Sequence, residues 1–520
     1  MQSVSNEWIA ANTKNILPLS DVKISYYIED KNVTQYYNYT SNSGGGSWVA
    51  TDYASLYDRN ANYEKFIVLD YGSFILDGTY VPYESTMPQG LVLKGPNATA
   101  ITIEIHFSQV ITTTLETLTL KWGEAKGIGQ YDTYIRVRNN NTTISSFTYN
   151  IPDGEMISII PINLSNFDEI TFTISMPKKN TCAYVEQVIF GGLMEFTKKD
   201  IIKVVQKDII DPNNLALPTH TMTFELDNRD GRFNPDNPTG IYSYLQEGQE
   251  ILLKYGLWID NAFEYIIGGT YFLTKWNVPN NGITATFEVG SKLDFMNDIF
   301  VAGLPTSRPH SQTLALAINR SGIDSSWFSV DNSLLTNSGY EILYDNNAKL
   351  NEIIQYICNA ERIRLYIDRL GVIHIDEMFD GDISSLTQEN YTIDKNISYK
   401  AGEYELIRPL KNVTMTYATS TSNTDVKETT NVNADGVAQT LNNLLISTSA
   451  NAISVNNQVE NILTNRKRIS GSFRPDIRLD IWDRIYITNK YATNLSVLIT
   501  ELEITYNGAF SGTYKGIIKE

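Results

Sequence analysis

The sequence feature that most constrains the fold is a long run, residues 60–195, in which no helical period appears. Its segments alternate apolar and polar residues, most strictly in "ITIEIHF", where Ile101, Ile103, Ile105 and Phe107 alternate with polar side chains. A period of two places every second side chain on the same face of a β-strand. Because several half-buried strands must cover one another's apolar faces, the run predicts a β-sandwich.

The same patterns divide the chain into five predicted segments. A triple glycine at 44–46 separates an N-terminal arm from the sandwich. Apolar residues at positions i, i+3, i+4, i+7 and i+8 of "LNEIIQYIC" (350–358) predict a helix within a small α+β unit. We therefore expect a mainly β, multidomain chain: an arm (1–43), a β-sandwich (44–195), a β domain that forms a small barrel or twisted sheet (196–300), an α+β domain (301–400) and a C-terminal β domain with one helix (401–520).

Composition and charge exclude several classes of protein. The chain has 520 residues and a formal net charge of −18, which repels a phosphate backbone, so we expect no nucleic-acid recognition. Cys182 and Cys358 lie far apart and outside any zinc-binding spacing, which argues against a disulfide framework. The sequence contains no apolar run long enough for a membrane span and no secretory signal, so we predict synthesis in the cytoplasm and no transmembrane segment.

One stretch, "FELDNRDGRFNPDNPTG" (224–240), concentrates aspartate, asparagine, proline and glycine. An EF-hand loop with Gly231 at its sixth position would place Leu226 and Asn237 at the first and twelfth positions, where neither residue can serve. Catalytic use of its carboxylates stays open, but the same residue types are those that reverse a chain. We interpret the stretch as a structural turn motif formed by Asp227, Asp230, Gly231, Pro235, Asn237 and Pro238.

Motifs that would indicate chemistry are missing from the sequence. It contains no HExxH, GxSxG or P-loop pattern, and its four histidines, His106, His220, His310 and His374, are scattered. We expect His106 and His374, which fall within predicted strands, to be packed or hydrogen-bonded residues. Two carboxylates distant in the sequence could still hydrolyse glycosides, but nothing selects such a pair. The prediction is a non-enzymatic chain with no catalytic residue, cofactor or metal site.

The turn stretch resembles a known signature when it is extended to residues 224–256, "FELDNRDGRFNPDNPTGIYSYLQEGQEILLKYG". Tail proteins of bacteriophages and prophages of Gram-positive bacteria carry such a turn, followed by Tyr-x-x-Leu and Gly-Gln before the next strand. The segments "FILDGTYVPY" (74–83) and "AYVEQVIFGGLMEFTKKDII" (183–202) are similar to the two ends of a discoidin-like, galactose-binding-type sandwich that often precedes this signature. The segment "VLITELEITYNGAFSGTYKG" (497–516) is similar to the family's closing strands.

The resemblance implies a structural virion protein, a tail-tip or baseplate hub subunit that closes the tail tube and anchors peripheral host-recognition proteins. Its implied partners are the tail tube, the distal tail ring and fibre or receptor-binding proteins. It also implies a homo-oligomer, a trimer, at the tip of the virion tail. The sequence departs from the family in "ISMPKKNTCAYVEQV" (174–188), which keeps Pro177 and two lysines but has no arginine.

Binding of host cell-surface carbohydrate through the 44–195 sandwich is the alternative prediction. Aromatic side chains stack on sugar rings, and Trp48, Trp122 and Tyr131 are the candidates in this segment. The interpretation that we favour is that these side chains fill the sandwich core or face other tail proteins, because tyrosine and tryptophan commonly anchor interfaces.

Overall fold

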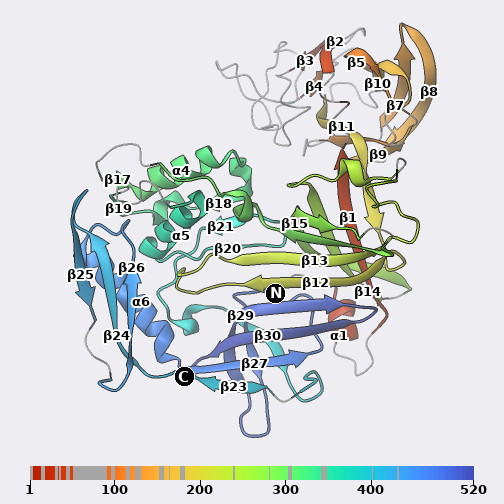
Figure 1. Ribbon diagram of the computed structural model, residues 1–520. Coiled ribbons are helices and arrows are strands. Elements are labelled where there is room, and N and C mark those ends of the chain that lie inside the picture. Colours follow the sequence, from red (N-terminus) through yellow and green to blue (C-terminus); the bar gives the residue numbers. More distant parts are fainter. Residues whose placement is uncertain are drawn as a thin grey trace. The chain divides into compact units, whose positions relative to one another are not determined.

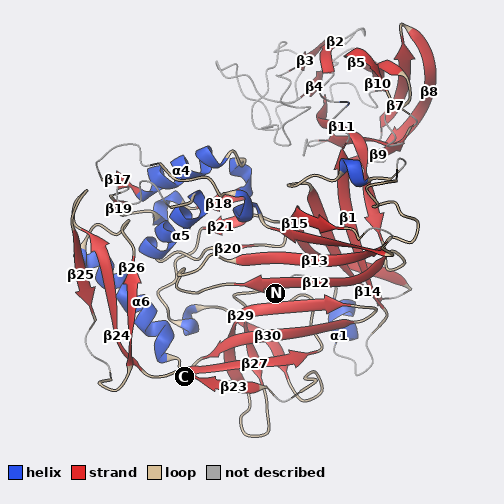
Figure 2. Cartoon of the chain, in the orientation of Figure 1, coloured by secondary structure: helices blue, strands red, loops and turns tan. Residues whose placement is uncertain are grey.

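The chain folds into two compact units in the computed structural model. Unit 1 comprises Met1–Ser25, Glu195–Asp236 and Gln246–Glu520, and unit 2 comprises Tyr26–Met194 and Asn237–Leu245. Strands dominate and helices are few (Figure 2), so the predicted mainly β, multidomain fold is confirmed. The structure describes residues 4–12, 18–29, 33, 37–41, 47–50, 91–94, 100–112, 117–122, 131–151, 157–162, 164–175, 182–237, 240–259, 261–279, 282–301, 307–340, 348–400, 402–429 and 433–520.

Unit 2 contains two antiparallel sheets of described strands. The first sheet has the order β2–β5–β10–β7–β8, with bounds Tyr37–Ser41, Ala100–Ile111, Phe167–Ser175, Tyr131–Asn139 and Thr142–Ile151. The second sheet has the order β3–β4–β11–β6–β9, with bounds Ser47–Ala50, Leu91–Lys94, Cys182–Phe196, Thr117–Trp122 and Ile157–Pro161.

The two sheets share one apolar core, which makes unit 2 a β-sandwich. On β5, Ile105 and Phe107 are buried, as the alternating pattern predicts. The ring of Phe107 lies 5.4 Å from the rings of both Phe167 on β10 and Phe190 on β11, in edge-to-face geometry. Such ring pairs add about 0.5–1.5 kcal/mol beyond the burial of area. Because β10 and β11 belong to different sheets, these contacts join the sheets.

Unit 1 is built on a long antiparallel sheet. Neighbouring strands β13, β12, β29, β30 and β27 lie side by side in Figure 1. β28 (Arg484–Ile487) pairs with the start of β29, and β22 (Gln388–Ile393) runs parallel to β28. From β14 the order is β14–β15–β16–β13–β12–β29–β30–β27–β23, and β1 (Ser20–Glu29) also pairs with β14; the bounds are Glu250–Ile259, Ala262–Asn277, Thr284–Gly290, Thr219–Asp227, Ile201–Ile209, Leu495–Tyr506, Phe510–Ile518, Lys467–Phe473 and Glu403–Leu406.

The predicted barrel does not close among the described strands, and the sheet of unit 1 stays open. It curls instead, so that the ring of Tyr255 on β14 lies 5.2 Å from that of Phe510 on β30, several strands away in the sheet. Arg369, from the hairpin of β20 (Tyr366–Ile367) and β21 (Ile373–Ile375), bonds to both β15 and the 474–483 loop. Arg369 thus ties β15 to the 474–483 loop within unit 1.

The helices of unit 1 pack by their apolar faces. α4 (His310–Ser321) and α5 (Leu350–Glu361) lie against each other, and α6 (Ser449–Thr464) packs on β24 (Figure 1). The helix predicted at 350–358 is confirmed, because its five periodic apolar residues are all buried. The sheet under α6 has the order β25–β24–β26, with bounds Thr424–Glu428, Leu410–Ala418 and Val437–Asn442.

Short elements complete the described chain. α1 (Asn6–Asn12) is tied to β15 because Ser5 donates a hydrogen bond to Glu264 (2.6 Å). The described helices include none with the length and apolar character that crossing a membrane requires. The remaining elements are β17 (Arg308–Pro309), β18 (Phe328–Val330), β19 (Ser338–Gly339) and 3-10 turns at Tyr242–Tyr244, Lys292–Phe295, Ser325–Trp327, Asn332–Leu334 and Ile383–Ser385.

Replacing Phe167 with alanine should destabilise the sandwich by about 3–5 kcal/mol, because it leaves a cavity between the two sheets. The free energy of unfolding, measured by urea denaturation, checks this expectation. Tyr134→Ala on β7 of the same sheet is the control, since Tyr134 is exposed, and it should cost about 0.5 kcal/mol or less. Equal losses in the two variants would contradict a core shared at Phe167.

Candidate functional site

The turn after β13 is fixed by one buried asparagine. The side chain of Asn228 accepts a hydrogen bond from the backbone N–H of Phe233 (3.0 Å) and donates one to the carbonyl oxygen of Gly282 (3.2 Å). Gly231 has a φ of +70°, a left-handed conformation that glycine adopts without strain, and its N–H donates to the Asn228 carbonyl (2.9 Å). The buried ring of Phe233 packs edge-on against Phe287 (5.2 Å). The turn is therefore anchored in the sheet.

The aspartates of this turn are engaged by their own neighbours. Asp227 accepts hydrogen bonds from the backbone N–H and the Nε of Arg229 (3.0 and 2.8 Å), and the bond to the guanidinium holds the pKa of Asp227 below its usual range. Asp230 accepts from the backbone N–H and the Nε of Arg232 in the same way (3.1 and 2.7 Å). A carboxylate that accepts from the residue two positions on forms an Asx-turn. Both carboxylates therefore stabilise the turn through hydrogen bonds to residues of the turn itself.

Two further residues of the predicted motif lie in the described chain. Pro235 is part of a turn, and the carbonyl of Asn237 accepts a hydrogen bond from the N–H of Gly240 (3.0 Å). Pro238 lies outside the described residues.

The predicted glycan-stacking residues divide between the two sheets of the sandwich. Trp48 lies on β3 and Trp122 on β6, both in the second sheet, whereas Tyr131 lies on β7 of the first. Their side chains are outside the described part of the chain, so their role stays a prediction.

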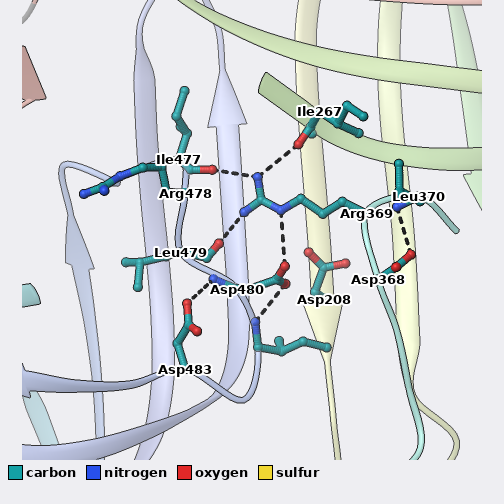
Figure 3. Close-up of polar contacts among 12 residues, drawn as sticks. Asp208, Ile267, Asp368, Arg369, Leu370, Ile477, Arg478, Leu479, Asp480 and Asp483 are labelled. Carbon is teal, nitrogen blue, oxygen red and sulfur yellow. Dashed lines mark hydrogen bonds and ion pairs between the residues drawn. The ribbon is translucent and has the colours of Figure 1, made fainter. Parts of the chain in front are cut away.

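A buried arginine, Arg369, joins distant segments of unit 1 (Figure 3). Its Nη1 donates to the carbonyl oxygens of Ile267 on β15 (3.2 Å) and of Ile477 (2.7 Å), and its Nη2 donates to the carbonyl of Leu479. Its Nε lies 3.4 Å from a carboxylate oxygen of Asp480. A guanidinium carries five N–H donors in a planar fork, so one side chain can hold acceptors from two segments at once.

The hairpin that carries Arg369 is shaped by Asp368 and His374. One carboxylate oxygen of Asp368 accepts from the N–H groups of Leu370 and Val372 (both 2.9 Å), and the other lies 3.1 Å from Nε2 of His374. The Nδ1 of His374 lies 2.8 Å from Asp376. Hydrogen bonding to Asp368, supported by Asp376, raises the pKa of His374 even though partial burial opposes this. His374 is thus a residue of β21 whose hydrogen bonds to Asp368 and Asp376 stabilise the hairpin.

The inner face of β12 and β13 carries a second buried polar group. Asp208 lies 2.6 Å from Nδ1 of His220, and Gln206 donates to Asp208 (2.7 Å) while accepting from the hydroxyl of Tyr255 (2.6 Å). The ring of His220 stacks on that of Tyr271, with centroids 4.4 Å apart. Burial raises the pKa of both tyrosines, so their hydroxyls stay protonated, and that of Tyr255 is the donor to Gln206. These residues form a polar interior that holds β12, β13, β14 and β15 in register.

Asp480 is an acid with a strongly displaced pKa in this interior. Burial raises the pKa of Asp480 to about 6; Arg369 opposes this shift, and the carboxylates of Asp208 and Asp483 reinforce it. Its backbone N–H donates to Asp483 (2.7 Å), which fixes the loop that meets Arg369 (Figure 3). The folded chain therefore binds a proton on Asp480 more tightly than an unfolded chain does.

A stripe of side-chain amides on α5 clamps the loop between β12 and β13. Asn351, Gln355 and Asn359 recur every four residues and are buried. Gln355 donates to the carbonyl of Asn214 (3.1 Å) and Asn359 to that of Asn213 (2.8 Å). Asn214, which has a φ of +51°, returns a bond to the helix end at the carbonyl of residue 363 (2.6 Å). The spacing of four was a signal in the sequence that reasoning from apolar periodicity missed.

A buried ion pair links α4 and α5. Nδ1 of His310 lies 2.7 Å from a carboxylate oxygen of Glu361, and Nε2 lies 3.0 Å from the carbonyl oxygen of Leu445. Although burial raises the pKa of Glu361, hydrogen bonds from His310 and Asn337 bring it below its usual range. Both ring nitrogens of His310 thus face oxygen acceptors, one on α5 and one in the loop at Leu445.

These groups are arranged for internal bonding. Burial raises the pKa of the Cys358 thiol, which keeps it protonated and a poor nucleophile. Within the described part of the chain, no three His, Cys, Asp or Glu residues come together as a metal site would require. Arg369 has no local signal in the sequence, because its acceptors lie about a hundred residues away on either side. The candidate site therefore consists of several buried groups of hydrogen-bonded side chains and of the turn after β13.

Comparisons with known proteins give similarity at the level of structure. No family model matches the chain, and no curated protein matches it. The 43 kDa tail protein of prophage MuSo2 from Shewanella oneidensis has a TM-score of 0.43 at 11% identity, covering 63% of this chain and 96% of that chain. The tail protein from Neisseria meningitidis MC58 has a TM-score of 0.43 at 9% identity, covering 63% and 94%. Prophage tail protein gp18 from Listeria monocytogenes EGD-e has a TM-score of 0.39 at 10% identity, covering 63% and 92%. At these TM-scores the likenesses carry no argument about the function of this chain.

Replacing Asn228 with alanine should cost about 1–3 kcal/mol of folding stability, because the N–H of Phe233 and the carbonyl of Gly282 lose their partner. Asn234→Ala is the matched control: Asn234 accepts only from the N–H of Asp236 in an exposed turn and should cost about 0.5 kcal/mol. Thermal and urea unfolding measure both variants. Similar small losses in both would contradict the role of Asn228 as the anchor of the turn.

The Asp480→Asn variant should change the pH dependence of stability. Because the folded pKa of about 6 is above the ordinary 3.8, the contribution of Asp480 is fully present below pH 3.8 and is lost as pH rises through 6. Relative to the parent chain, the variant should therefore gain about 3 kcal/mol between pH 4 and 7. Urea unfolding at several pH values measures this difference, with the exposed Asp230→Asn as control. A constant difference across this range would contradict the raised pKa.

Proposed function

We propose that this chain is a structural subunit of a phage-type tail, built into the tail tip or baseplate hub, where it closes the tail tube and anchors peripheral host-recognition proteins. The observation that carries the proposal is the 224–256 stretch, which has the residues of the tail-protein signature. In the folded chain Asn228, Asp227 and Gly231 in the first part of this stretch stabilise a turn, as expected of a structural motif.

The second part of the signature also has a structural use. Tyr242 begins a 3-10 turn and Leu245 follows its last residue, so that the N–H of Leu245 donates to the carbonyl of Tyr242 (3.1 Å). Gly248 has a φ of +82°, and its N–H donates to the carbonyl of Leu273 (2.7 Å). Gln249 is buried and accepts the N–H of Gln246 on its side chain (2.8 Å). The signature therefore consists of residues that the local backbone needs.

The proposal includes a homo-oligomer, a trimer, in contact with the tail tube and with fibre or receptor-binding proteins. Exposed apolar side chains on the strands of unit 1 suit such contacts, among them Ile202 on β12 and Trp258 on β14. Carbohydrate binding through the sandwich is retained as the alternative outcome of the experiments below.

The location of the chain in particles tests the proposal most directly. Virions or tail particles that carry an epitope tag on this chain should bind gold-labelled antibody at the tail tip. Label on the head or along the tail shaft would contradict the hub role. Sedimentation equilibrium of the purified chain should give a trimer, whereas a monomer that binds defined glycans on an array would favour the alternative.

An enzymatic function is tested separately. We expect no hydrolytic activity in the parent chain or in the Asp230→Asn and Gly231→Ala variants. Purified cell walls incubated with any of the three should release no reducing sugar. Gly231→Ala should instead lower folding stability by about 1 kcal/mol, since alanine is strained at a positive φ. Sugar release by the parent chain that a folded Asp230→Asn variant lacks would overturn the structural interpretation of the turn.

A further inference from the structure

β23 (Glu403–Leu406) forms an edge of the sheet in unit 1. It pairs in antiparallel register with β27, and it has no other partner among the described strands. All four of its residues are exposed. The outer side of its backbone therefore offers N–H and C=O groups to one further strand.

One face of β23 is apolar and uncovered. Tyr404 lies directly opposite Ile469 of β27, which is buried, so this face of β23 meets the core side at Tyr404, whereas Leu406 on the same face lies opposite the exposed Lys467. Tyr404 and Leu406 are 51% and 60% exposed. Tyr491 is 88% exposed, and Asn489 of the same loop donates a hydrogen bond to the Tyr404 hydroxyl. At this edge of the sheet, Tyr404, Leu406 and Tyr491 are therefore apolar side chains that lie largely uncovered.

The size of this surface distinguishes between two kinds of occupant. A large side chain presents about 150–250 Å² when it is fully exposed, so Tyr404, Leu406 and Tyr491 together expose roughly 400 Å². A stable interface between two proteins needs about 800 Å² from each partner. Two copies of the chain would also each bring a net charge of −18. Area and charge therefore disfavour a second copy, whereas a single added strand matches the area available.

The opposite face of β23 determines the charge of the added strand. Glu403 and Glu405 alternate with the apolar residues and lie on the other face. Glu405 is opposite Arg468 on β27, whereas Glu403 is opposite Ser470 and has no ion-pair partner in the described chain. A neighbouring strand with lysine or arginine on this face would pair with the glutamates, since opposite charges across strands stabilise a sheet.

We propose that β23 binds an extended segment of another protein, in which apolar residues alternate with lysine or arginine, as an added strand of the sheet. Backbone hydrogen bonds to the free edge supply affinity, and the alternation of apolar and basic residues supplies selectivity. This inference goes beyond the proposed tail function and does not depend on it.

Binding of two synthetic peptides of equal length, (Lys-Val)4 and (Glu-Val)4, to the full chain tests the inference. Fluorescence anisotropy should show saturable binding of the basic peptide with a Kd at least tenfold lower than that of the acidic peptide. A (Lys-Val)4 peptide with alternate amides N-methylated keeps its charge but loses edge donors, and it should bind at least tenfold more weakly. Hydrogen exchange should slow at 403–406 when the basic peptide is bound.

Point variants separate this edge from the rest of the acidic surface. Leu406→Asn and Glu403→Gln should each weaken binding of the basic peptide about fivefold. Val426→Asn is the matched control, because Val426 is 51% exposed on β25, which is also an edge strand, and it should have no effect. Equal binding of the two peptides, full binding of the N-methylated peptide, or protection at β25 would overturn the proposal. Self-association of the chain that Leu406→Asn abolishes would overturn the choice of occupant.

Discussion

The architecture of unit 1 depends on the hydrogen bonds of one buried guanidinium. Arg369 meets the carbonyl oxygens of β15 and of the 477–479 loop, and it lies beside Asp480 (Figure 3). Burying a charge costs free energy, and the attraction of a single carboxylate rarely offsets that cost by itself. Here the Nη donors are matched to the backbone carbonyls of Ile267, Ile477 and Leu479. A lysine at this position would present a single ammonium group in place of the planar fork, so the lock is specific to arginine.

The local parts of the fold could be predicted from the sequence because their causes are local. The alternation at 101–107 sets the buried face of β5, and the apolar period at 350–358 sets the buried face of α5. The open sheet of unit 1 could not be predicted in this way, because it pairs strands that are far apart in the sequence, such as β12 with β29, and such pairing has no local signal. The role of Arg369 escaped prediction for the same reason: its acceptors at 267 and 477 are about a hundred residues away in opposite directions.

The turn after β13 is the stretch for which the sequence leaves several interpretations open. Aspartates at this density are compatible with a metal site, with catalysis and with chain reversal. In the folded chain Asp227 and Asp230 each accept from the arginine two positions on, so each carboxylate already has donors from its own turn. The buried residue that holds the turn is Asn228, whose side chain accepts from the N–H of Phe233 and donates to the carbonyl of Gly282. Residue types alone did not distinguish this buried asparagine from its exposed neighbours.

The net charge of −18 constrains how copies of this chain can approach one another. Screening limits repulsion to about 8 Å at physiological ionic strength, so the charges that matter are those next to a contact. Many carboxylates of unit 1 are already paired within the chain, as Glu501 is with Lys515 (2.6 Å) and Asp476 with Arg478 (2.9 Å). Exposed pairs add little to stability, but they lower the local field and so permit close contact. An oligomer would therefore use surfaces where the carboxylates are paired. Glu403 is unpaired in the described chain, which makes the β23 edge a poor contact for another copy and a suitable one for a basic partner.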